Sequence, residues 1–258
     1  MTRFKPLTED LMSEAQKKAA RELASGPRGR MNPNGPNALF LRSPDLMSRT
    51  QKVGEYLRYS SSLPTRLNEF AILVTARQWN AQVEWIAHYP LALKAGLDPA
   101  VAEDLKVGKR PAAMKADEAA IYQFCRELHE TRQVSDVTFK AVFDLYGERG
   151  VIDLVALTGY YTMLAMVLNV AQQPLPGGVE PPLPALEGLF GQPTVVNNPL
   201  SLAAVPTILA FILGINLGTL GFLTSCPAEH AGETLSAALD GRLIEVNKAY
   251  AAILGYQP

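Results

Sequence analysis

The chain has little cysteine and almost no net charge. It holds two cysteines among 258 residues, Cys125 and Cys226, and its formal net charge is −1. Two isolated cysteines form neither a disulfide framework nor a CxxC redox motif. Proteins that bind nucleic acid need a basic excess to neutralise phosphates. We therefore expect no nucleic-acid partner.

The first 26 residues lack the apolar stretch of a secretory signal, because they are charged and amphipathic. Unpaired thiols are typical of the cytoplasm, and we expect the chain to be located there. What the chain does have is apolar content, with 48% hydrophobic and 19% charged residues. These proportions are ordinary for a soluble globular protein with a real core.

Helical signals dominate residues 38–173, and no run of alternating β-branched residues predicts a sheet there. We therefore expect an all-α domain over 38–173. Residues 1–37 form an expected helix, capped by Thr8 or Ser13 and running to about Leu23, and then a loop rich in Gly and Pro. Further helices are predicted over 43–59, 64–90, 91–95, 98–106, 117–131, 135–147 and 150–171.

The strongest helical pattern starts near Pro64, with apolar residues recurring at steps of three and four. Pro90 is expected to end or kink this helix, because proline lacks a backbone N–H. The last segment, 150–171, is apolar almost all round, which is typical of a helix buried in a core or at a subunit interface.

Glu69, Glu84 and His88 are the candidate catalytic residues. Glu84 and His88 are four positions apart, so on a helix they share one face. A carboxylate beside an imidazole raises the imidazole pKa and orients one ring nitrogen. Glu69 lies fifteen residues before Glu84, which is too far to touch His88 on one continuous helix. Glu69 acts in the same site only if the helix breaks between them.

Two other interpretations of these residues stay open at this point. A Glu–His pair at this spacing is common on solvated helix faces and contributes only a few tenths of a kcal/mol. A metal site is the second alternative, but Glu-x3-His supplies too few ligands and no HExxH or CxxC accompanies it. We therefore predict no bound metal.

The segment SSLPTRLNEFAILVTARQWNAQVEWIAHYPLALKAGL resembles the core motif of the carboxymuconolactone decarboxylase family, which includes alkylhydroperoxidase-D-like proteins. Glu69 matches the first Glu of that motif and His88 its His. Ala81 and Glu84 stand where the peroxidase branch has two cysteines. Glu-Trp-Ile-Ala-His at 84–88 matches the decarboxylase-like branch, as do GYYTMLAMVLN, GPRG, LRSPDL and GEYLRY. The resemblance covers roughly residues 24–175.

This resemblance implies a helical bundle carrying a cofactor-free carboxy-lyase that acts on a small carboxylate or lactone. Loss of CO2 beside a carbonyl leaves an enolate-like carbanion, which needs charge stabilisation and a proton. In this hypothesis His88 is the general acid/base, Glu84 orients it, and Glu69 is a second proton carrier. Arg58 or Arg66 binds the substrate carboxylate, although a surface ion pair is the alternative, more so for Arg66. Tyr160 and Tyr161 line the pocket or pack in the core, and Trp79 and Trp85 belong to the core or an interface.

A non-catalytic oligomeric interaction module on the same fold is the alternative function. The family resemblance implies a homotrimer or hexamer in either case. Peroxidase activity is the weaker alternative, because a thiol peroxidase needs a thiolate and a resolving thiol. Ala81 supplies neither, and Cys125 is expected to be a buried core residue.

The remainder of the chain does not continue the family pattern. Residues 174–185 are a predicted linker, rich in Pro and Gly, and 186–258 form a tail of unassigned fold. The tail resembles fragments of the flavin subunit of NADH dehydrogenase, of NAD kinase and of a PAS domain, like a patchwork, so we assign it no flavin, NAD or sensing function. Residues 199–223 carry no charge over 25 positions, yet we favour a poorly packed or partner-covered apolar segment over a membrane span.

Overall fold

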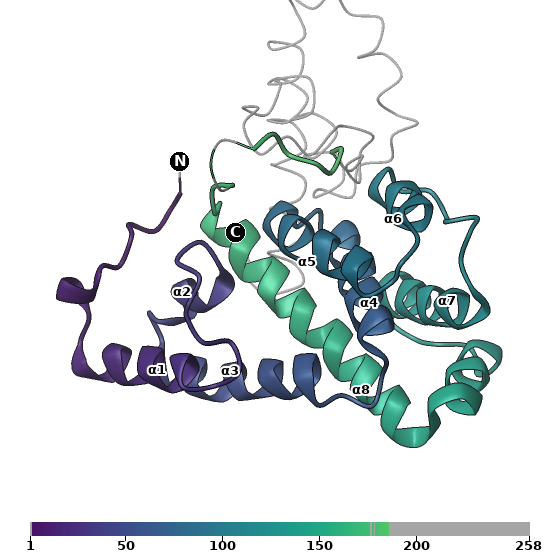
Figure 1. Cartoon of the computed structure of the whole chain (residues 1–258), viewed down its shortest axis with the longest axis horizontal. Helices are drawn as coiled ribbons and strands as arrows, with labels where there is room; N and C mark the ends of the chain where they lie inside the picture. Colours follow the sequence, from purple (N-terminus) through teal and green to yellow (C-terminus); the bar gives the residue numbers. More distant parts are fainter. Residues whose placement is uncertain (1, 176, 178, 186–258) are drawn as a thin grey trace, which may run out of the picture. The chain divides into compact units, whose positions relative to one another are not determined.

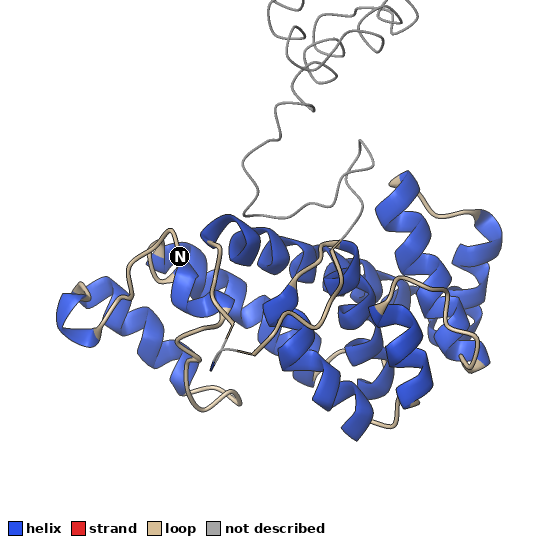
Figure 2. Cartoon of the chain, turned by 90° about the horizontal axis from the view of Figure 1, so that it is seen from above, coloured by secondary structure: helices blue, strands red, loops and turns tan. Residues whose placement is uncertain are grey.

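The computed structural model describes residues 2–175, 177 and 179–185, and all regular structure in these ranges is helical (Figures 1 and 2). The predicted all-α class is therefore confirmed. A 3₁₀ turn at Glu9–Leu11 precedes eight α-helices: α1 Glu14–Ala24, α2 Pro36–Phe40, α3 Pro44–Tyr59, α4 Thr65–Gln78, α5 Gln82–Lys94, α6 Pro99–Lys106, α7 Ala116–Thr131 and α8 Asp136–Ala171.

Capping residues explain where several of these helices begin. Ser13 caps α1 in a reciprocal arrangement with Gln16, Asp98 accepts the N–H of Ala100 at the start of α6, and Ser135 caps α8. Proline stands in the first turn of α2, α3 and α6, where its missing N–H costs nothing. The predicted helix starts at these three capping residues are confirmed.

Helix α4 is the central element of the fold. All eleven residues from Leu67 to Arg77 are buried, because α4 packs against α5, α6, α7 and α8. The core around it includes the large side chains of Phe70, Trp85 and Phe124. Burial of such side chains contributes about 1.5–3 kcal/mol each. A helix enclosed on all sides is a rigid platform for any polar side chain that it carries.

The helical conformation is interrupted between α4 and α5, at residues 79–81. Asn80 adopts a left-handed conformation with φ of 48°, and Ala81 hydrogen-bonds back to the carbonyl of Ala76. The predicted single helix over 64–90 is therefore wrong, because the structure divides it into α4 and α5. The prediction that Pro90 ends the helix, with a separate helix over 91–95, is also wrong, since α5 continues through Pro90 to Lys94. Proline removes one backbone hydrogen bond there, while burial of Trp85 and Ala92 on either side holds the helix to the core.

Helix α8 joins two predicted helices across a kink. Gly147 has φ of 63° and ψ of −171°, which interrupts the helical geometry where the sequence predicts a helix end. Beyond the kink, α8 packs against α2, α3, α4 and α7. Within the described ranges, α8 is the helix long and apolar enough to cross a membrane, but a buried core helix passes the same test.

The segments flanking the predicted domain are tied to it. Helix α1 packs on α3, and Ala19 and Leu23 join the main core. At the other end, the side chain of Gln82 bonds both the N–H and the carbonyl of Leu183, which is buried. The predicted linker 174–185 therefore returns to α5 at Leu183. The expectations for 186–258, including the apolar stretch 199–223, lie outside the described residues.

Candidate active site

The break between α4 and α5 brings Glu69, Glu84 and His88 together. Nδ1 of His88 lies 2.6 Å from Oε2 of Glu69 on α4, and Nε2 lies 3.4 Å from Oε2 of Glu84 on α5. Each ring nitrogen therefore faces its own carboxylate. The sequence allowed Glu69 to act in the same site only if the helix breaks before Glu84, and the structure shows this break. Glu69 reaches His88 because the chain reverses direction at residues 79–81.

The three side chains are almost completely buried, with residue exposures of 6% for Glu69, 4% for Glu84 and 5% for His88. Burial by itself lowers the pKa of His88, but the hydrogen bonds and negative charges of Glu69 and Glu84 outweigh it, so the pKa is raised above the ordinary 6.5. A charged imidazolium donates to both carboxylates at once. Such a cluster can hold a proton and pass it between its members.

Two tyrosines of α8 border the cluster. The ring of Tyr161 meets the His88 ring edge-on at 5.0 Å between centroids, and Tyr160 packs edge-on against Tyr161. Both are buried, and burial raises the pKa of each phenol. Both tyrosines are therefore neutral over the physiological range and contribute shape and hydrogen-bonding groups. Trp85 is a core residue, and Trp79 is half-buried against the same core.

The two predicted substrate arginines have different surroundings. Arg66 is held by Asp117 at 2.6 Å and by Glu118, both on α7. Arg58 has no carboxylate at ion-pair distance among the described residues, and its Nε is buried without a hydrogen-bond partner. Burial alone lowers the pKa of Arg58, but nearby phenols and the charges of Glu69 and Glu84 raise it overall. Arg58 therefore has hydrogen-bonding capacity to spare, whereas Arg66 is engaged.

A hollow of about 690 Å³ opens beside this cluster. Three cationic residues, Arg58, Arg66 and Lys94, line it together with Glu69, whereas His88 and Glu84 do not. Its remaining lining residues are Tyr59, Pro64, Thr65, Leu91 and Ala95. The volume is in the range of small-molecule sites. A positively charged hollow with one carboxylate in its wall suits a small anionic molecule.

Sequence reasoning missed a third arginine, which lies near the cluster. Arg28, from the Gly/Pro-rich loop before α2, lies beside the hydroxyl of Tyr160, and that hydroxyl and the Arg28 Nε are buried without hydrogen-bond partners. Both approach Gly54 on α3 so closely that a Cβ at this position would collide with them. The GPRG segment that includes Arg28 contributes to the family resemblance, but its composition alone does not predict the position of the Arg28 side chain.

Cys125 has no features of a redox thiol. It is fully buried on α7, contacts the hydroxyl of Thr158, and has its pKa raised to about 12 by burial. A protonated, inaccessible thiol is a poor nucleophile. Ala81, at the first cysteine position of the peroxidase pattern, is buried at the start of α5. In the described ranges, no group of three His, Cys, Asp or Glu side chains is arranged to hold a metal ion.

No protein-family model and no curated protein matches this chain. Among solved structures, an uncharacterized peroxidase-related protein from Ralstonia eutropha JMP134, described as an alkylhydroperoxidase AhpD core, is similar. The TM-score is 0.56 and the identity 14%, over 68% of this chain and 93% of that one. At such low identity the likeness concerns the fold alone. The helical part of the chain therefore has the all-α AhpD-like fold.

Proposed function

We propose that this chain is a cofactor-free carboxy-lyase of the carboxymuconolactone decarboxylase type, acting on a small carboxylate or lactone. The observation that carries the proposal is the buried imidazole of His88 between Glu69 and Glu84, next to a positively charged hollow. Even when paired, three buried titratable groups contribute little net stability, because their desolvation offsets the attraction between them. The burial of His88 with Glu84 thus favours catalysis over the non-catalytic interaction module.

The chemistry follows from which side chains face the hollow. Arg58, with unused hydrogen-bonding capacity, binds the carboxylate or the oxygen on which negative charge develops. Arg28 lies beside Tyr160 and does not line the hollow. Arg66 lines the hollow but is paired with α7, so we give it a structural role. Tyr160 and Tyr161 do not line this hollow; they are buried core residues, and Tyr161 packs against the His88 ring.

Decarboxylation then needs one proton at carbon. The bond to the carboxylate breaks, CO2 leaves, and the electron pair moves onto the adjacent carbonyl as an enolate. The proton carried by His88 passes across the 2.6 Å contact to Glu69, which borders the hollow and delivers it to the carbon. One proton from solvent then recharges the site in each turnover. Glu84 orients the imidazole and stabilises its charged form. The reaction requires no electron transfer and no thiol.

We also propose that the protein is a cytoplasmic homo-oligomer, a trimer or hexamer. Support comes from α8, which exposes several large apolar side chains on its outer face, including Ile152 and Val170 at 66% and 58%. Contiguous apolar surface of this kind is typical of subunit contacts. We expect no nucleic-acid partner, because the net charge is −1.

A paired activity assay tests the proposed reaction. The purified full chain is screened for CO2 release from lactone carboxylates and β-keto acids, and for reduction of organic hydroperoxides with a dithiol. We expect CO2 release from at least one substrate and no peroxide reduction, because the described thiol is buried and protonated.

The matched variant is Cys125→Ser, which keeps the size of the side chain and its contact with Thr158. CO2 release is expected to stay unchanged in this variant. Absence of CO2 release across the screen, together with a peroxidase activity that disappears in Cys125→Ser, would show that the chain works as a thiol peroxidase instead.

A further inference from the structure

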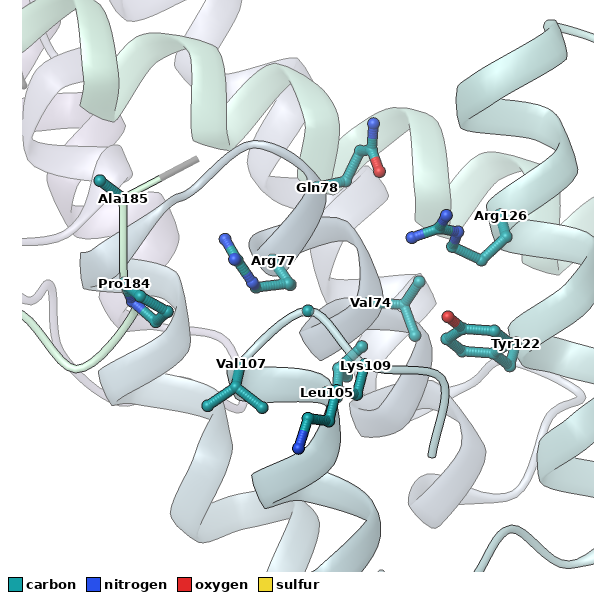
Figure 3. Close-up of a pocket in the computed structure, with 11 residues that line it drawn as sticks. Val74, Arg77, Gln78, Leu105, Val107, Lys109, Tyr122, Arg126, Pro184 and Ala185 are labelled. Carbon is teal, nitrogen blue, oxygen red and sulfur yellow. The ribbon is translucent and has the colours of Figure 1, made fainter. Parts of the chain in front are cut away.

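A second hollow, of about 550 Å³, lies on the other end of α4 (Figure 3). Arg77, which lines it, is eight residues beyond Glu69 on the same helix, roughly 12 Å along the axis. Its lining contains three cationic side chains and no carboxylate: Val74, Arg77, Gln78, Leu105, Val107, Gly108, Lys109, Tyr122, Arg126, Pro184 and Ala185. This hollow shares no lining residue with the proposed active site.

Arg77 is an unusual residue to bury. It is 9% exposed, its Nε has no hydrogen-bond partner, and no carboxylate lies at ion-pair distance within the described part of the chain. One terminal nitrogen donates to the side-chain oxygen of Asn80 at 3.3 Å, and the other lies beside Gly108. Burial lowers the pKa of Arg77. A buried cation without a counter-ion is costly, so a binding partner that brings negative charge is favoured.

The other cations leave the hollow positive. Lys109 is exposed and forms no ion pair in the described ranges, while Arg126 pairs with Glu130 and lies over the Tyr122 ring at 5.9 Å. Figure 3 shows Arg77 and Arg126 on opposite sides of Val74, while the amino group of Lys109 points away from both. The apolar side chains of Val74, Leu105 and Val107 and the Tyr122 ring line the same hollow. The hollow thus combines an oxyanion-binding group with apolar walls.

We infer that this hollow is a second binding site, for a small ligand that carries a phosphate or carboxylate group on an aromatic or apolar body. Arg77 holds the oxyanion, because a guanidinium presents donors in the fork geometry of such groups, and Lys109 adds positive charge to the lining. The apolar body lies against Val107, Leu105 and Tyr122. The inference is independent of the proposed lyase activity.

Isothermal titration calorimetry with the full chain tests the site, with phenyl phosphate and benzoate as probes. We expect saturable binding of at least one probe, and the comparison separates phosphate from carboxylate recognition. Arg77→Gln is expected to weaken binding at least about tenfold and Lys109→Gln about threefold or more. Lys106→Gln is the matched control, because it removes the same charge three residues from Lys109 outside the hollow, and should change the Kd less than about twofold.

Several results would overturn the inference. One is the absence of saturable binding to the wild-type chain. Another is an unchanged Kd in Lys109→Gln and in a folded Arg77→Gln; if Arg77→Gln fails to fold, Arg126→Gln replaces it beside Lys109→Gln. The third is loss of binding in Arg58→Gln, which would place the probe in the proposed active site instead.

Discussion

His88→Gln is expected to lower kcat for CO2 release by at least about 100-fold, the usual contribution of a positioned general acid or base. Glutamine fills a similar volume and still offers a donor to Glu69 or Glu84. It cannot carry and release a proton. The variant therefore removes the proton-carrying group of the site while preserving its packing. We expect kcat to fall while the stability of the fold is unchanged.

His129→Gln is the matched control for this substitution. His129 is the other described histidine, half-buried on α7 and hydrogen-bonded to Thr75 on α4, so it has a comparable setting without a carboxylate partner. Turnover should stay within about twofold of wild type, because His129 touches none of the proposed catalytic groups. A His88→Gln protein that keeps wild-type turnover, with unchanged helix content, would remove His88 from the mechanism.

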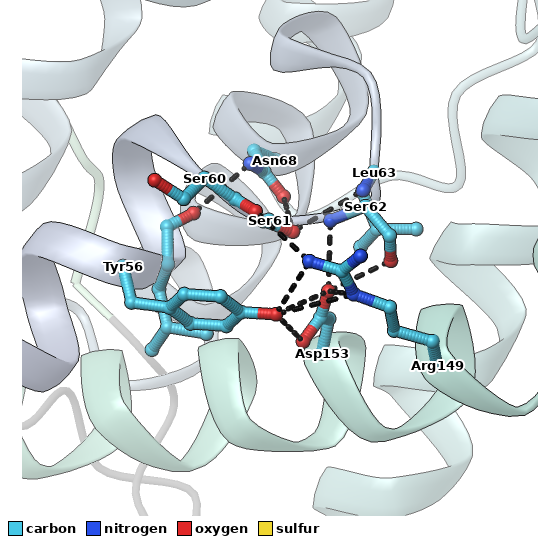
Figure 4. Close-up of polar contacts among 9 residues, drawn as sticks. Tyr56, Ser60, Ser61, Ser62, Leu63, Asn68, Arg149 and Asp153 are labelled. Atoms are coloured by element: carbon cyan, nitrogen blue, oxygen red, sulfur yellow. Dashed lines mark hydrogen bonds and ion pairs between the residues drawn. The ribbon is translucent and has the colours of Figure 1, made fainter.

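Asp153→Asn is expected to destabilise the protein by about 2–4 kcal/mol at neutral pH, the range for a buried, multiply bonded carboxylate. Asp153 on α8 accepts the backbone N–H and hydroxyl of Ser62 at 2.8 and 2.7 Å and the hydroxyl of Tyr56 at 3.0 Å, with Arg149 alongside (Figure 4). This one carboxylate ties α3 and the loop before α4 to α8. Asparagine keeps the size but removes the charge and one acceptor.

The pH dependence of this loss follows from the pKa of Asp153. Burial alone raises that pKa, but the hydrogen bonds from Ser62 and Tyr56 and the charge of Arg149 lower it overall. A folded pKa below the unfolded value means that the stabilisation is present above the unfolded pKa, about 3.9, and is lost as the pH falls through the folded pKa. The stability difference between wild type and Asp153→Asn should therefore shrink below about pH 4.

Urea denaturation followed by circular dichroism measures this difference at pH 7 and at pH 3. Asp144→Asn is the control, since it removes the same charge from α8 at an exposed position where Asp144 pairs with Lys140. We expect that control to cost less than about 1 kcal/mol. Equal costs for the two variants at pH 7 would mean that the Asp153 network does not hold these elements together.

Much of the fold is encoded locally and was predictable. Ser13, Asp98 and Ser135 mark helix starts through their own side chains, and the glycine at 147 marks an interruption. The predicted helix end at Pro90 was wrong because the penalty of proline in a helix is local. The packing of Trp85 and Ala92, which outweighs that penalty, depends on the rest of the core.

The site was only partly predictable for the same reason. The spacing of Glu84 and His88 places them on one helix face, but the contact with Glu69 depends on the left-handed conformation of Asn80, which no pattern of hydrophobic residues signals. The difference between Arg58 and Arg66 depends on carboxylates more than fifty positions away from Arg66. Arg28 reaches the site from a loop whose path is set by tertiary packing.

The pKa of His88 in the folded protein tests the central claim most directly. It is measured by NMR titration of the labelled imidazole, with His129→Gln and His230→Gln used to assign the signals. The structure predicts a pKa above 6.5 that falls in Glu69→Gln, because the contact at 2.6 Å stabilises the charged ring. A pKa at or below 6.5, or one that Glu69→Gln leaves unchanged, would contradict the proposed proton store.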